Sequence, residues 1–278
     1  MTERLRVADA AHHAREALEG GDPVTGLTVL ESSGGGPAPG ERMCVWMDRH
    51  AGTLGDPNLD AAAIRIARRA LADGARPGTH VVQAGDLRCS VYLEPHVAPP
   101  ELVIVGAGHV ARPLCQVGAQ LGFRVTVLDD RPEFATRERF PDAAVVRPAD
   151  FADPLRGIRI GRRTYLVLVT RGHKYDFEAL RSLLLGSDVP AYVGMIGSRR
   201  RTRAALEALA RAGIGADRLA AVHAPIGLDV GAETPEEIAV AIAAELVMVR
   251  RGGTGQRLRD RERVHERWVA PRGGARGE

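Results

Sequence analysis

The sequence predicts an α/β protein with a mainly parallel sheet in its C-terminal part and a small α+β domain before it. Two observations carry this prediction. From residue 101 onward, short apolar runs alternate with helix-like segments, which is the pattern of parallel βαβ units. In the first such unit, the apolar residues 102–105 lead into Gly-x-Gly-x-x-Ala and a helix-like segment, and a second apolar run follows.

The glycine motif, from Gly106 to Ala111, predicts a Rossmann-like nucleotide-binding turn. Gly106 permits a tight turn, Gly108 lets a pyrophosphate approach the backbone, and Ala111 allows helix and strand to pack closely. The helix start supplies amide donors and the positive end of a dipole. Asp129 follows by about 20 residues, the offset at which a dinucleotide fold binds ribose hydroxyls. The alternative is a doubly wound domain that keeps its glycines only for packing.

The first part of the chain predicts the small α+β domain, over residues 1–97. The expected elements are a helix at 3–19, strands at 26–30, 42–47, 79–83 and 89–96, a turn at 56–60 and an alanine-rich helix at 61–71. Pro95, Pro99 and Pro100 mark the linker to the second domain.

The Rossmann-like domain is expected over residues 101–252. We expect strands at 102–105, 124–128, 143–147, 164–169 and 191–196, and helices at 109–121, 176–185, 198–212 and 235–250. The last helix opens with a capping box from Thr234 to Glu237. Its apolar run 238–244 predicts burial by the sheet and by a partner domain or subunit, which suggests a homodimer. Residues 253–278 are expected to form a flexible tail.

Composition favours a soluble globular protein. The 278 residues are 45% hydrophobic and 26% charged, with a net charge of +3. No apolar run reaches transmembrane length and the N-terminus has no apolar signal core, so we expect a cytoplasmic location and no membrane partner. The Arg-rich C-terminal segment also carries acids, so no nucleic-acid arm is expected. The three cysteines lack metal-ligand spacing, and no metal site is predicted.

Four polar clusters follow the predicted strands, and parallel sheets gather their ligands at these carboxyl ends. We expect the cofactor-binding residues to be Gly106, Gly108, His109, Val110, Asp129, Asp130, Arg131, Thr170, Gly197, Ser198, Arg199 and Arg200. The arginines open a helix, where the dipole disfavours cations unless an anion binds there. The alternative is that they are solvated.

The cluster after the fourth strand supplies the candidate catalytic residues His173, Lys174 and Asp176. A histidine with a nearby carboxylate suits acid–base chemistry, although a purely structural histidine is the alternative. His223, in a turn-rich loop before the last helix, could close the same cleft.

The clusters together resemble the XdhC/CoxI family, the accessory proteins for molybdenum hydroxylases such as xanthine dehydrogenase. The similar stretches are residues 103–111, 128–135, 192–201 and 225–239, with a weaker likeness at 33–43. The resemblance implies a Rossmann-like C-terminal domain. It also implies binding of molybdenum cofactor (molybdopterin), help with its sulfuration, and delivery to an apo-hydroxylase.

This chain departs from the family at two cysteines. Family members usually carry a Gly-Gly-Cys-Val-Glu segment, where this chain has 55–60, and often a cysteine where it has Ala224. Thiolates bind soft metals and carry sulfur. Three hypotheses follow: an accessory protein that binds molybdenum cofactor and a hydroxylase apo-enzyme; an NAD(P)-dependent oxidoreductase acting on a small molecule; and a nucleotide-binding regulatory or assembly protein without chemistry. Asp129 predicts NAD(H) over NADP(H), because a carboxylate repels a 2′-phosphate.

Overall fold

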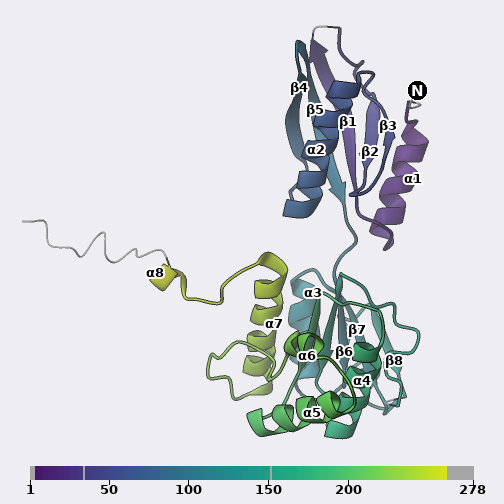
Figure 1. The fold of residues 1–278 in the computed structure, drawn as a ribbon. Helices are drawn as coiled ribbons and strands as arrows, with labels where there is room; N and C mark the ends of the chain where they lie inside the picture. Colours follow the sequence, from purple (N-terminus) through teal and green to yellow (C-terminus); the bar gives the residue numbers. More distant parts are fainter. Residues whose placement is uncertain (1–3, 34, 151, 262–278) are drawn as a thin grey trace, which may run out of the picture. The chain divides into compact units, whose positions relative to one another are not determined.

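The computed structural model describes residues 4–33, 35–150 and 152–261. The chain divides into two compact units that meet in sequence at Pro99 and Pro100 (Figure 1). Among the described residues, no helix is long and apolar enough to cross a membrane.

The N-terminal unit contains an antiparallel five-stranded sheet with helices packed on it. The strand order is β3-β2-β1-β5-β4. The strands are β1 (Val24–Ser33), β2 (Arg42–Val45), β3 (His50–Gly52), β4 (Gly78–Ala84) and β5 (Leu87–His96); the helices are α1 (Val7–Leu18) and α2 (Pro57–Asp73). Helix α2 buries its alanine-rich side against β1, β2, β4 and β5. Ala17 of α1 belongs to a separate small apolar cluster with Trp46.

Helix α2 begins earlier than predicted from the sequence, and the prediction of a turn at residues 56–60 is wrong. Asp56 is the N-cap, its carboxylate accepting hydrogen bonds from the backbone N–H groups of Asn58 and Leu59, and Pro57 is the first helical residue. Proline suits this position because the N–H it lacks would have no helical acceptor. The Asp-Pro pair is therefore a helix start.

The C-terminal unit contains a six-stranded parallel sheet in the order β11-β10-β9-β6-β7-β8. Its strands are β6 (Glu101–Val105), β7 (Arg124–Asp129), β8 (Val145–Pro148), β9 (Thr164–Leu168), β10 (Tyr192–Met195) and β11 (Val222–His223). Its helices are α3 (Ala111–Gln120), α4 (His173–Leu185), α5 (Arg199–Arg211), α6 (Ala216–Ala220), α7 (Pro235–Arg251) and α8 (Leu258–Arg261). The order reverses between β6 and β9, which confirms the predicted Rossmann-like sheet.

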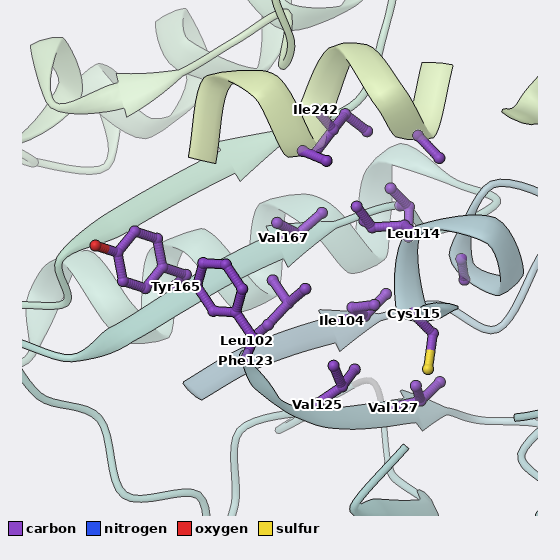
Figure 2. Packing of buried hydrophobic residues seen from close by; sticks show 14 of the residues in the cluster. Leu102, Ile104, Leu114, Cys115, Phe123, Val125, Val127, Tyr165, Val167 and Ile242 are labelled. Carbon is purple, nitrogen blue, oxygen red and sulfur yellow. The ribbon is translucent and has the colours of Figure 1, made fainter. Parts of the chain in front are cut away.

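Both faces of this sheet are covered by helices. On β6, Leu102 and Ile104 belong to the core cluster shared with α3 and α7, whereas Val103 and Val105 belong to the cluster shared with α4 and α5. Figure 2 shows Ile242 of α7 packed over the strands of the first face. Burial on both faces explains why these strands are continuous apolar runs.

The remaining differences are short elements and the start of α4, which begins at His173 where the prediction had residue 176. The sequence missed β3, β11 and α6, which have three, two and five residues and are too short to show a periodic pattern. The predicted tail contains the short helix α8, and residues 262–278 lie outside the described part. Helix α7 keeps its predicted capping box, and its Val240 is 57% exposed, so its apolar surface is only partly buried within this unit.

Candidate functional site

The glycine turn lies where the strand order reverses, at the carboxyl end of β6. Gly106 has a φ of +106°, and a Cβ there would lie 2.6 Å from the carbonyl oxygen of Val169 in the segment after β9. Only glycine satisfies both demands, because other residues rarely adopt this φ and the neighbouring backbone leaves no room. Gly106 therefore joins the ends of β6 and β9 tightly.

The next residues of the turn are open. Gly108 has no atom within 4 Å of the position a Cβ would take, and the His109 side chain is exposed. In the described part of the chain, no protein acceptor binds the N–H group of Gly108 or His109, and the start of α3, after Val110, carries no acidic side chain. Free amides at a helix start attract anions. This arrangement suits a phosphate.

Asp129 is fully engaged within the protein. Its buried carboxylate accepts hydrogen bonds from the N–H of Ala107 at 2.6 Å, the N–H of Arg131 at 3.0 Å, and the Arg131 guanidinium at 2.8 and 3.1 Å. Burial alone would raise its pKa, but the hydrogen bonds from Arg131 and Ala107 outweigh burial and lower it. The carboxylate therefore braces the glycine turn. Its binding of ribose hydroxyls remains a prediction.

An ion pair joins the loops on either side of the turn. The guanidinium of Arg171, after β9, lies 2.8 Å from the carboxylate of Asp130, after β7. Because β6 lies between these strands, the pair crosses the region of the glycine turn. Burial and the neighbouring Asp129 raise the pKa of Asp130, against the attraction of Arg171. The sequence analysis did not single out Arg171.

The first turn of α4, directly after the loop that follows β9, contains a buried acid. The Asp176 carboxyl is 4% exposed and lies 2.6 Å from the hydroxyl of Thr170, which directly follows the Val169 carbonyl packed on Gly106. Burial raises the pKa of Asp176 to about 6. This group therefore exchanges a proton near neutral pH. His173 and Lys174 are the first residues of α4, and their side chains lie outside what the structure describes.

The arginine cluster opens α5. Ser198 is the N-cap and accepts a hydrogen bond from the backbone N–H of Arg201 at 3.4 Å, while Gly197 lies just before it. Arg199 and Arg200 are exposed, and no carboxylate within the described ranges pairs with them.

Helices α4 and α5 share one core cluster, which brings the start of α5 near the first turn of α4. Burial raises the pKa of Asp176, and the Thr170 hydroxyl and then the charge of Arg201 oppose that rise. The structure thus links all four sequence clusters along the carboxyl edge. Asp129 binds the glycine turn, Asp130 pairs with Arg171 in the loop after β9, and Asp176 lies near the start of α5.

A further polar cluster escaped the sequence analysis. The buried carboxylate of Glu245, on α7, accepts hydrogen bonds from the Tyr192 hydroxyl at 2.6 Å and the Gly227 N–H at 2.7 Å, and it contacts Nδ1 of His223 at 2.9 Å. A carboxylate inside an apolar helix run was the available signal, because such groups are buried only with partners. His223 thus ties the edge strand β11 to α7.

The cysteines are all buried away from solvent. Burial raises the pKa of Cys44 and of Cys115 to about 11, and it also raises the pKa of Cys89. These thiols stay protonated at neutral pH, which makes them poor nucleophiles and metal ligands. Across the described ranges, no cluster of three or more His, Cys, Asp or Glu residues could hold a metal ion.

Comparisons with known proteins agree with the geometry. The family described as XdhC Rossmann domain matches residues 102–246, and the XdhC and CoxI family matches residues 17–83. The uncharacterized protein YqeB of Escherichia coli (strain K12) is 30% identical over 245 residues, covering 84% of this chain and 44% of that protein. A protein of Bacillus subtilis (strain 168), named as a probable subunit of xanthine dehydrogenase, is 30% identical over 166 residues, covering 60% of this chain and 48% of that protein.

The chain therefore spans about half the length of these curated relatives. A crystal structure described as a xanthine dehydrogenase from Bacillus halodurans has a similar fold, with a TM-score of 0.51 at 20% identity, covering 88% of this chain and 96% of that chain.

Proposed function

Because the chain belongs to the XdhC and CoxI family, we propose that it is an accessory protein that binds molybdenum cofactor and assists maturation of a molybdenum hydroxylase such as xanthine dehydrogenase. The observation that carries the proposal is the open glycine turn, whose free amides stand at a helix start next to the reversal of strand order. The hydroxylase partner and a homodimeric state belong to the same proposal.

The residues at this edge suit the phosphate of molybdopterin. The amides of Gly108 and His109 would hold phosphate oxygens, and the exposed guanidinium groups of Arg199 and Arg200 would supply bidentate donors from the start of α5. When the cofactor is bound to the client enzyme, its molybdenum supplies the hydroxylation chemistry. This chain would bind the cofactor's phosphate and protect the cofactor during transfer.

The structure gives no support to sulfur transfer by this chain. Its cysteines are buried and protonated, and a sulfur carrier needs an accessible thiolate. We therefore propose binding and delivery of the cofactor, with sulfuration performed by another protein.

A second candidate function is favoured by Asp176. Its pKa of about 6, its burial and its contact with Thr170 suit a general acid or base beside the glycine turn. An NAD(P)-dependent oxidoreductase would use such a group for proton transfer alongside hydride transfer. His173 and Lys174 would assist from the same helix start.

A titration separates the two functions. We expect the purified protein to bind molybdenum cofactor more tightly than NADH or NADPH, and to raise the activity of an apo-hydroxylase supplied with that cofactor. Tight binding of a reduced nicotinamide without binding of molybdenum cofactor would refute the accessory role and favour the oxidoreductase. Binding of neither class would refute both.

A further inference from the structure

The glycine turn is held by a second basic side chain that the sequence analysis missed. Arg139, in the segment before β8, donates a hydrogen bond from Nη2 to the carbonyl of Ala107 at 3.3 Å. Ala107 is thus bound on both sides, because its N–H is donated to Asp129. The turn is fixed before any ligand arrives.

Arg139 also belongs to a small cation–aromatic group. The guanidinium carbons of Arg131 and Arg139 lie 3.7 and 4.6 Å from the centre of the Phe134 ring. Arg131 is neutralised by its pairing with Asp129. Arg139 differs, because no carboxylate in the described part of the chain pairs with it and its Nε is buried without a hydrogen-bond partner. A buried charged donor without an acceptor is costly.

The charges in contact with the turn therefore do not cancel. Asp129 and Asp130 are matched by Arg131 and Arg171, and the nearby carboxylate of Glu133 is exposed and acts on Arg131. Arg139 remains as a cation that contacts the turn without an ion-pair partner among the described residues. Within the described ranges, the end of β7, where a dinucleotide fold places its ribose, offers no accessible free carboxylate to bind a diol, because Asp129 is bound by Ala107 and Arg131 and the oxygen of Asp130 without a hydrogen-bond partner, Oδ1, is buried. It offers positive charge instead, which would attract a phosphate.

We infer that Arg139 is the specificity-determining residue of this site, and that it selects ligands carrying a phosphomonoester at the β7 flank of the glycine turn over ligands carrying a free ribose diol there. The inference rests on the proposed function of the turn as a phosphate-binding site. It reverses the nicotinamide preference expected from Asp129 alone, because that carboxylate is engaged by Ala107 and Arg131.

The test uses NADPH and NADH as probes, because they differ only in the 2′-phosphate. We expect the wild-type protein to bind NADPH about tenfold more tightly than NADH at low salt. Arg139→Gln should bring the two affinities within about twofold, and Arg139→Lys should keep part of the difference because it keeps the charge. Arg124→Gln is the matched control, since Arg124 is exposed at the start of β7, the opposite end of that strand.

Equal binding of the two probes by the wild type, or a preference that survives in Arg139→Gln, would overturn the inference while leaving the turn as a phosphate site. If the wild type binds neither probe, the inference fails, and titration with molybdenum cofactor then decides the proposed function separately. A thermal unfolding curve for each variant shows whether it folds. If Arg139→Gln loses the preference for NADPH over NADH, this supports the inference only if Arg139→Lys is also folded and retains part of that preference.

Discussion

Replacing Asp129 with asparagine separates bracing of the glycine turn from ribose binding. The carboxylate accepts hydrogen bonds from Ala107 and Arg131 and is almost fully buried. Asparagine keeps one acceptor for Ala107 but leaves the Arg131 guanidinium without its charge partner. Breaking a buried ion pair costs about 3–5 kcal/mol, and we expect about 2–3 kcal/mol here, because Arg131 is 24% exposed and water can reach it.

Hydrogen exchange read by mass spectrometry measures this loss within one molecule. Peptides from β6 and β7 should exchange about 30- to 150-fold faster in Asp129→Asn, while peptides from β1 and β5 of the other unit serve as an internal reference. Asp142→Asn is the control variant, because that side chain is exposed.

The pH dependence of the effect follows from the pKa. The folded protein lowers the pKa of Asp129, so its contribution is present above about pH 4 and is lost as the pH falls further. Unchanged exchange in β6 and β7, combined with weaker binding of NADH, would refute bracing and restore Asp129 as a ribose ligand.

Three further changes test the surrounding structure. Glu245→Gln should destabilise the C-terminal unit by about 2–4 kcal/mol at pH 7. This difference should disappear as the pH falls below about 4, because the folded protein lowers the pKa of Glu245. Chemical denaturation of both proteins at several pH values measures it. The raised pKa of Asp176, about 6, makes the wild type about 1 kcal/mol less stable at pH 7 than at pH 5. Asp176→Asn should remove this difference in stability. A difference that persists in the variant would contradict the raised pKa of Asp176. Gly118→Ala should lower stability by about 1–3 kcal/mol, because the added Cβ would lie 2.6 Å from Leu102; an unchanged melting temperature would show that α3 shifts freely.

The sequence predicted the sheet because its strands are buried on both faces and therefore read as apolar runs between helical segments. It also predicted the capping box of α7, because that box depends on neighbouring residues alone. Elements as short as β11 have no period to detect. The predicted start of α2 was wrong because an Asp-Pro pair such as Asp56–Pro57 suits a turn as well as a helix cap.

The partners of the site residues could not be predicted in the same way. Spacing placed Asp129 at the end of its strand, but it could not show that the side chain turns toward Ala107 and Arg131. Arg139 lies in a segment without periodicity, so nothing in the sequence linked it to Ala107. The charge of a site is set by which side chains pair with each other, and that information exists only in the fold.

A phosphate-bearing cofactor is proposed to bind over Gly108, and a bulky residue at that position tests this binding most directly. Gly108→Trp fills the open side of the turn, while Gly161→Trp places the same side chain in open space just before β9, at that strand's amino end. Equilibrium binding of molybdenum cofactor should weaken more than tenfold in Gly108→Trp and stay unchanged in Gly161→Trp. Equal affinity in the wild type and both folded variants would contradict the claim and leave the glycine turn with a packing role alone.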